Sequence, residues 1–272
     1  MINLKIILED ILTPINCSIL IKEIIKYIAY NSKQIPHNYE IFSRMLLNRQ
    51  RNFMANSESI DESAPVLSMK ETKVHIFYKK MNAVFENFES TFKSLENELC
   101  LCSDIREVMV IIGPNISVPK HIIRILIPSL AVGHSIAYHP ARKNLLSVYR
   151  NLLECNELSD SLFKTNGPTN MFILLGLLPN SDGPKSSNFH PVDHINLKQN
   201  VQKTIIDLTN PLIENVDCNC EINNDNIKLN SNNYENYIYF KSITIINGFK
   251  DFKIDGVSAL NIFRTLPITK NF

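Results

Sequence analysis

Tryptophan is absent from this sequence and glycine is scarce, with 7 glycines among 272 residues. Glycine makes up about 7% of an ordinary sequence, so the deficit is deep. Glycine-rich loops that cradle phosphate groups need backbone close to the ligand, and neither G-x-x-x-x-G-K-[ST] nor G-x-G-x-x-G occurs. These absences argue against a Walker-type ATPase and against a dinucleotide-binding enzyme.

An excess of charge of one sign is also missing. The chain has 28 Lys and Arg residues and 27 Asp and Glu residues, so its formal net charge is +1. A dedicated nucleic-acid binder would be expected to carry a clear excess of basic residues. No apolar run approaches the roughly 18 residues of a membrane span. Glu9 and Asp10 interrupt the first apolar segment, so no signal peptide is expected. The sequence predicts a folded protein of the cytosol or nucleus that binds neither nucleic acid nor membrane.

Common zinc-binding spacings are missing as well. The six cysteines include two C-x-C pairs, which are shorter than the C-x₂₋₄-C spacing of structural zinc sites, and reduced thiols are expected. One alternative remains open: His190 and His194 could join Cys218 and Cys220 in a four-ligand zinc site, in an enzyme or a zinc-stabilised binding protein. The main expectation is a protein without metal or cofactor.

Apolar residues at helical spacing predict four helices, over residues 14–31, 39–47, 74–95 and from Pro140 to about 156. In the last of these, the face expected to be apolar carries Leu145, Val148, Tyr149, Leu152 and Leu153. Residues 48–70 show no periodicity and are predicted to form a mobile loop.

Strands are predicted at the unbroken apolar runs 108–112 and 171–175, and the last third of the chain is rich in residues that favour strands. The run 122–127 fits either an extended segment or a short helix. The expectation is one α+β domain over residues 1–252, with an antiparallel sheet completed late in the chain, followed by a C-terminal tail at 253–272.

Motifs of well-known catalytic sites do not occur. The sequence contains no G-x-S-x-G, no H-E-x-x-H and no kinase signature. His134 and His139 lack a nucleophile or carboxylate at a matching spacing, and a surface or turn position explains them better. Cys155 lies at the C-terminal end of a predicted helix, where the helix dipole disfavours a thiolate. The sequence therefore favours a binding protein over an enzyme.

Three blocks of sequence are more distinctive than the composition. They are Ile25-Lys26-Tyr27-Ile28-Ala29-Tyr30-Asn31-Ser32-Lys33-Gln34-Ile35-Pro36 with Tyr39-Glu40, then Val108-Met109-Val110-Ile111-Ile112-Gly113 with Val118-Pro119-Lys120, and finally Glu235-Asn236-Tyr237-Ile238-Tyr239-Phe240 with Gly248-Phe249. In order and spacing they resemble the comet adaptors of the spindle checkpoint, which bind Mad-two and belong to the HORMA domain family. The resemblance covers residues 19 to 251.

The resemblance implies a HORMA domain: a mainly antiparallel sheet with about three core helices on one face and a C-terminal safety-belt region. It also implies a non-enzymatic adaptor that binds closed Mad-two and presents it to a hexameric AAA+ remodelling ATPase of the Pch-two type. The mitotic checkpoint complex is thereby disassembled and the checkpoint silenced. Such an adaptor is expected in nucleus and cytoplasm, with kinetochore or spindle association in mitosis. Another HORMA scaffold, of the meiotic axis or of autophagy, remains an alternative.

The resemblance also implies where Mad-two would bind: at the end of the first helix and on the helix after Pro140. The residues carried over are Asn31, Arg142, Leu145, Tyr149 and Arg150. An aromatic side chain with a polar tip and flanking cations is typical of an interface anchor. The helical phase of Tyr149 with Leu145 and Leu152 fits a core position equally well, so both interpretations stay open.

A second surface follows from the family's contact with the ATPase, an aromatic-x-Pro-basic loop. Phe189 and Pro191 match this pattern, although Val192 stands in place of the basic residue. An ordinary proline-containing surface loop is the alternative. Within a HORMA fold, residues 237–249 would occupy the site that a ligand peptide fills in Mad-two, which predicts a closed-like domain that does not switch.

Overall fold

The computed structural model of the chain describes residues 1–57, 69–131, 141–164, 167–192, 195, 201–210 and 237–265. These residues form an α+β fold. Its elements, in chain order, are β1 (Ile2–Ile7), α1 (Pro14–Asn31), α2 (Tyr39–Ser57), α3 (Met69–Leu101), β2 (Ile105–Gly113), β3 (His121–Leu126), α4 (Ala141–Glu154), α5 (Asn156–Phe163), β4 (Asn170–Leu177), β5 (Phe189–Pro191), β6 (Gln202–Thr209), β7 (Ile238–Ser242), β8 (Ile246–Asn247), β9 (Lys253–Ile254), β10 (Val257–Ser258) and α6 (Ala259–Thr265).

One mixed, mostly antiparallel sheet organises the fold. It has eight strands in the order β1-β6-β3-β2-β4-β7-β5, and β8 pairs with β4 outside this path. Strand β2 runs antiparallel to β3 and β4, and β7 runs antiparallel to β4 and β5. Strand β6 is parallel to both β1 and β3. The central strand predicted at 108–112 is confirmed as part of β2, and the ambiguous run at 122–127 is extended over residues 122–126, within strand β3.

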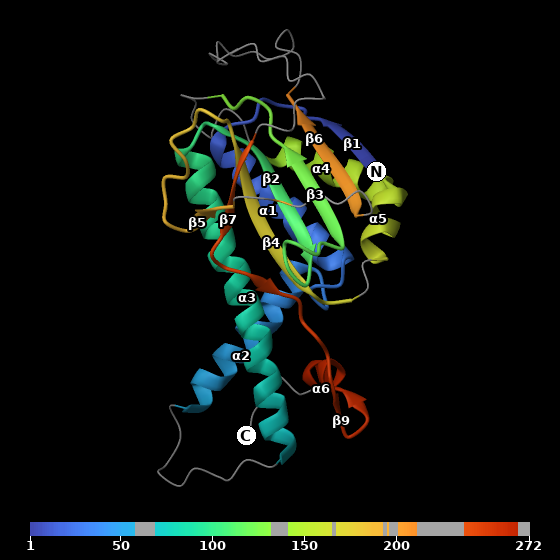
Figure 1. The fold of residues 1–272 in the computed structure, drawn as a ribbon. Coiled ribbons are helices and arrows are strands. Elements are labelled where there is room, and N and C mark those ends of the chain that lie inside the picture. The colour runs from blue at the N-terminus through green and yellow to red at the C-terminus, as the bar shows by residue number, and fades with distance from the viewer. Residues whose placement is uncertain are drawn as a thin grey trace.

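The described helices of the core cover one face of the sheet, with α1, α3 and α4 behind the strands in Figure 1. Alternation along β2 divides the apolar residues between two clusters: Val108 and Val110 pack on the helix side, whereas Met109 and Ile111 lie on the other. Both faces of β2 are therefore buried, which explains why its sequence is apolar without interruption from Val108 to Ile112.

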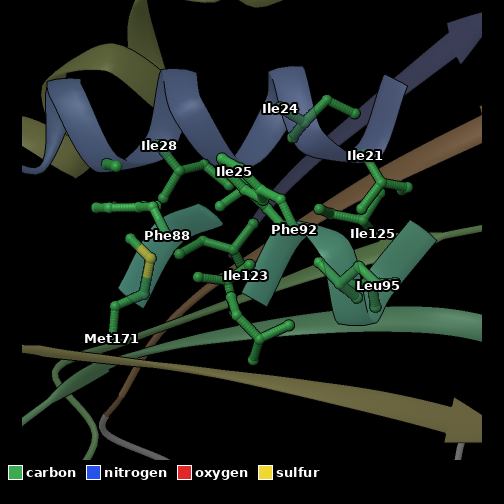
Figure 2. Packing of buried hydrophobic residues seen from close by; sticks show 14 of the residues in the cluster. Ile21, Ile24, Ile25, Ile28, Phe88, Phe92, Leu95, Ile123, Ile125 and Met171 are labelled. Carbon is green, nitrogen blue, oxygen red and sulfur yellow. The ribbon is translucent and has the colours of Figure 1, made fainter. Parts of the chain in front are cut away.

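Helix α1 supplies a stripe of isoleucines to the core. The helix begins where Thr13 Oγ1 accepts a hydrogen bond from Asn16 N, with Pro14 in its first turn. Ile21, Ile24, Ile25 and Ile28 are fully buried, and each contributes about 1.5–3 kcal/mol through burial. Figure 2 shows this stripe pointing toward side chains of α3 and of the sheet: Phe88, Phe92, Leu95, Ile123, Ile125 and Met171.

Helix α2 extends further than its apolar pattern suggests. It continues to Ser57, and α3 already begins at Met69, so the loop predicted at 48–70 is wrong for residues 48–57 and 69–70. Residues 58–68 lie outside the described part of the chain. The segment 48–57 lacks a regular apolar stripe, yet it contains several good helix formers, including arginine, glutamine, methionine and alanine.

The segment after residue 252 is also structured. Strands β9 and β10 form a hairpin whose turn places Asp255 and Gly256 at φ 51° and 83°, in the left-handed region. Ile254 and Ala259 are both 1% exposed. The β9–β10 hairpin and the following helix α6 lie beyond the lower end of the sheet in Figure 1, where α6 contacts α3. The predicted C-terminal tail at 253–272 thus contains secondary structure over residues 253–265, and 266–272 lie outside the description.

A buried glutamine holds the chain entering this segment. The Gln34 backbone oxygen accepts a hydrogen bond from Phe249 N at 2.7 Å, and its side-chain Oε1 accepts one from Thr169 N at 2.8 Å. Thr169 O in turn accepts from Gly248 N at 2.7 Å. Phe249 packs edge-on against Phe77 of α3, with ring centroids 4.8 Å apart. The end of α1, the start of β4 and the C-terminal segment are thus joined at one point.

Candidate protein-docking surface

Helix α4 carries most of the predicted binding residues, and α1 helps to fix its position. Val148 and Leu152 are fully buried against the core. Next to them, the hydroxyl of Tyr27 on α1 donates a hydrogen bond to Leu152 O at 3.0 Å. Burial of this phenol raises the pKa of Tyr27. The inner side of α4 is therefore set by packing and by one specific polar contact.

Strand β1 fixes the first half of α4. Asn144 is fully buried, and its Oδ1 accepts hydrogen bonds from Glu9 N at 3.0 Å and Asp10 N at 2.9 Å. One helical turn later, Ser147 Oγ donates to Ile7 O at 3.0 Å. These hydrogen bonds satisfy the backbone oxygen of the last residue of β1 and two backbone N–H groups just after the strand. They hold α4 in one orientation, so its outer side is presented on a rigid support.

The outer side of α4 combines apolar and cationic side chains. Leu146 is 55% exposed and Leu153 is 68% exposed. Arg142 and Arg150 are exposed beside them, and neither takes part in an ion pair between described residues. Positions 142, 146, 149, 150 and 153 follow helical spacing and share one side of the helix. This set of five residues is called the α4 face.

Tyr149 lies at the border of the α4 face. Its ring is half-buried, and its hydroxyl donates a hydrogen bond to the Glu23 carboxylate on α1. Burial and this hydrogen bond raise the pKa of Tyr149 above its ordinary value. Tyr149 is therefore neither a fully buried core residue nor a freely exposed anchor, and the two interpretations left open by the sequence each describe part of its environment.

Two further predicted residues are turned inward. Leu145 is half-buried and packs against the main core. Asn31 is half-buried at the end of α1, where its Nδ2 donates to Tyr27 O at 2.9 Å. The structure thus brings Arg142, Tyr149 and Arg150 together on one helix face, whereas Leu145 and Asn31 have contacts within the fold.

Two residues of the α4 face were missed by sequence reasoning. The apolar pattern places Leu153 on the buried side and assigns no role to Leu146, whereas both side chains are exposed. Seven residues separate them, which places them on the same side of a helix, and Leu145, Val148 and Leu152 already supply a complete inner stripe. Apolar residues on both sides of one helix were the signal that could have identified this face.

The helices next to α4 also carry exposed aromatic side chains. Tyr30, near the end of α1, is 47% exposed, and Phe163, at the end of α5, is 63% exposed. Lys33 Nζ lies 3.6 Å from the centroid of the Phe163 ring, within range of a cation–π interaction. Helices α1, α4 and α5 contact one another, so these exposed aromatic residues belong to the two helices that adjoin α4.

The segment predicted to contact an ATPase is an edge strand and not a loop. Strand β5 contains Phe189 and Pro191 and pairs with β7. Phe189 is 4% exposed and belongs to the main core, so its ring is not on the surface. Pro191 and the intervening His190 are exposed. Only the outward residues of this strand are available to a partner, because Phe189 anchors it from within.

Metal ligation finds no support among the described residues. No group of three or more His, Cys, Asp or Glu side chains in that part of the chain could hold a metal ion. His190 is exposed on β5, whereas His194, Cys218 and Cys220 lie outside the description, as do His134 and His139. The zinc alternative therefore stays a prediction that elemental analysis of the purified protein would decide.

Buried polar side chains in the sheet are paired in ways that suit structure. The fully buried Glu107 accepts two hydrogen bonds from Arg124, from Nε at 2.7 Å and Nη2 at 2.5 Å. His121 Nε2 lies 2.9 Å from Thr204 Oγ1, and burial lowers the pKa of this histidine to about 4. Both pairs join neighbouring strands of the sheet: Glu107 on β2 with Arg124 on β3, and His121 on β3 with Thr204 on β6.

Comparison with known proteins finds no match: no family model fits the sequence, and no curated protein matches it. Among the described helices, none is both long enough and apolar enough to cross a membrane. The α4 face and the three sequence blocks described above are therefore the features that bear on function.

Proposed function

We propose that this protein is a non-enzymatic adaptor that binds closed Mad-two through the α4 face. The observation that carries the proposal is the pair of exposed leucines, Leu146 and Leu153, set between Arg142 and Arg150 on a rigidly held helix. Apolar anchors with a cationic rim are typical of protein interfaces. Because Asn144 and Ser147 already hold α4 in place, little conformational entropy is lost on docking.

A HORMA-type domain is the finer description of the fold that we propose. In support, the sheet is mostly antiparallel, the core helices lie on one face, and residues 238–247 return from the C-terminal part of the chain to pair with β4. In this proposal the returning segment belongs to the safety-belt region and fills the edge that a ligand peptide would otherwise use. The domain is then closed-like and should not trap an added Mad-two ligand peptide.

The second partner in this proposal is a Pch-two-type AAA+ ATPase. The exposed residues His190 and Pro191 on β5 would form its contact, with Phe189 holding the strand from inside. Presentation of closed Mad-two to the ATPase would disassemble the mitotic checkpoint complex and silence the spindle checkpoint. An adaptor with this role would work in nucleus and cytoplasm and associate with kinetochores or spindle in mitosis.

Size-exclusion chromatography with closed and with open Mad-two tests the proposal. A one-to-one complex with the closed form alone is expected, and Leu146→Glu with Leu153→Glu should abolish it. Tyr149→Asp should weaken it, because a second carboxylate would face Glu23. Leu101→Glu is the matched control, since Leu101 is 64% exposed on α3 and its change should leave the complex intact.

Two results would overturn the adaptor proposal. One is no complex with either form of Mad-two when the chain is folded by circular dichroism. The other is equal loss of binding in Leu101→Glu and in the double variant. Stoichiometric zinc in the purified protein would then favour the alternative with His190, His194, Cys218 and Cys220 as ligands. Capture of a closure-motif peptide would favour another HORMA scaffold.

A further inference from the structure

The two outer strands of the sheet are protected to very different degrees. Strand β5 has three residues and ends in Pro191, which has no N–H group to offer to another strand. At the opposite edge, β1 has six residues, contains no proline, and pairs with β6 alone among the described strands. Short length and proline are common protections of edge strands. The edge of β1, visible beside β6 in Figure 1, lacks both, and Lys5 is its one charged residue.

Hydrogen bonds at the end of β1 show which of its backbone groups point outward. Leu8 N donates to Thr209 O at 2.9 Å, so the even-numbered residues direct their backbone groups toward β6. Alternate residues of a strand point to opposite sides, and the groups of Asn3, Lys5 and Ile7 therefore point away from β6. The outward-pointing Ile7 O already accepts a hydrogen bond from Ser147 Oγ, so it is not open to another strand.

The open part of this edge is consequently short and well defined. It consists of the N–H and C=O groups of Asn3 and Lys5, which no described residue outside β1 reaches. The side chains of Asn3 and Lys5 are both exposed, and that of Ile7 is 63% exposed. Side chains at positions 2, 4 and 6 lie on the helix side of the sheet, where Ile6 is fully buried.

We propose that this edge pairs with the same edge of a second copy of the chain, as an antiparallel β1–β1 ladder centred on Leu4. In this register Asn3 of each copy lies opposite Lys5 of the other, and all open N–H and C=O groups form hydrogen bonds. Leu4 faces Leu4, and Ile2 faces Ile6, so apolar residues meet on the helix side. The interface is isologous, with one surface paired to itself about a two-fold axis.

Charge selects this register over its neighbour. Moving the centre of the ladder by one residue, to Lys5, would place the two lysines directly opposite each other, and like charges at that position are destabilising. The Leu4-centred register separates them and leaves each beside a neutral asparagine. Asp207 of β6 lies next to Lys5 in the sheet and shares its open face, so the lysine retains an acidic neighbour within its own copy.

Sedimentation of the full chain over a concentration series tests the pairing without any Mad-two, so its outcome is independent of the proposed function. Asn3→Asp would place a carboxylate opposite Lys5 of the second copy and should lower the dimer dissociation constant several-fold. Asn3→Lys should raise it several-fold. Ser187→Asp and Ser187→Lys make the same charge changes at an exposed position outside β1 and should have no effect.

Cross-linking tests the register. In a chain with the exposed Cys100 replaced by serine, Leu4→Cys should form a disulfide-linked dimer on mild oxidation, because the two residues form a close non-hydrogen-bonded pair. Lys5→Cys should not. A chain that stays monomeric at every concentration, also as Asn3→Asp, would overturn the proposal. A dimer whose dissociation constant is the same in Asn3→Asp and Asn3→Lys as in the unchanged chain would also overturn it. The same holds if Lys5→Cys forms the disulfide-linked dimer and Leu4→Cys does not.

Discussion

The hydroxyl of Tyr149 donates a hydrogen bond to the carboxylate of Glu23, and this contact connects α4 to α1. Glu23 Oε1 also lies 2.7 Å from Lys26 Nζ, which is 3.0 Å from Glu40 Oε1 on α2. Burial alone would lower the pKa of Lys26, but the hydrogen bonds and charges of the two carboxylates outweigh it and raise the pKa. The α4 face is thus linked through a short polar chain to two neighbouring helices.

Removing the Tyr149 hydroxyl should weaken this link. Tyr149→Phe is expected to lower the free energy of unfolding by about 1 kcal/mol at neutral pH, since the bond is charge-assisted but half-exposed. The folded state raises the pKa of Tyr149, so its contribution is complete below the ordinary phenol pKa of about 10 and declines as pH rises beyond it. Urea unfolding of both proteins should show curves that converge above that pH, and equal stability at neutral pH would contradict the prediction.

His121 should make the fold sensitive to mild acid. Burial lowers its pKa to about 4, whereas the unfolded chain binds the same proton near pH 6.5. Between these values the unfolded state is protonated and the folded state is not, so this residue should reduce stability by up to about 1.4 kcal/mol per pH unit as pH falls. His121→Gln should flatten the dependence measured by urea unfolding. An unchanged slope would show that other groups cause it.

The ion pair between Glu107 and Arg124 should behave as one unit. Arg124→Met leaves the fully buried Glu107 carboxylate without its main partner and should cost about 3–5 kcal/mol of unfolding free energy. Replacing both residues with methionine should cost less than that single change, because no unpaired charge is then buried. A double-variant cycle measures the difference, and a double variant less stable than Arg124→Met would refute this prediction.

Gly248 should tolerate no side chain. A Cβ there would lie 2.3 Å from Gln34 Oε1 and 2.6 Å from Thr169 O, so Gly248→Ala should destabilise the fold by about 2–3 kcal/mol through overpacking. Gly256→Ala is a useful comparison, since its surroundings are open and only its φ of +83° is unfavourable, at a cost of about 1 kcal/mol. Hydrogen exchange of the backbone amides in β7 and β8 should become faster in Gly248→Ala but not in Gly256→Ala.

Regular apolar patterns were sufficient to predict α1, α3, α4, β2 and β4, because each of these elements buries a continuous stripe or run against the core. Strand β1 was missed because it has one fully buried residue, Ile6, and its partner β6 lies about two hundred residues away in sequence. Its register depends on this distant pairing, which local periodicity does not report. The parallel pairing of β6 with β1 and β3 also joins segments far apart in sequence, so local periodicity does not predict it.

The candidate surface was predicted in part. The sequence indicated α4, its arginines and Tyr149, but assigned Leu153 to the wrong side of the helix. Buried side chains normally look apolar in sequence, whereas on α4 the polar residues Asn144 and Ser147 are buried because they bond to backbone groups of β1. Identifying the covered side of α4 therefore required knowing where β1 lies.

Pairing of β4 with β7 has a consequence for synthesis of the chain. Roughly sixty residues separate Leu177, the last residue of β4, from Ile238, the first residue of β7. At about 5–20 residues per second, a ribosome needs about 3–12 s to cover that interval. During this time β4 can pair with β2 but its other edge has no partner, and an open apolar strand edge favours chaperone engagement and off-pathway association. The protein is therefore most vulnerable to misfolding while its own last third is still being translated.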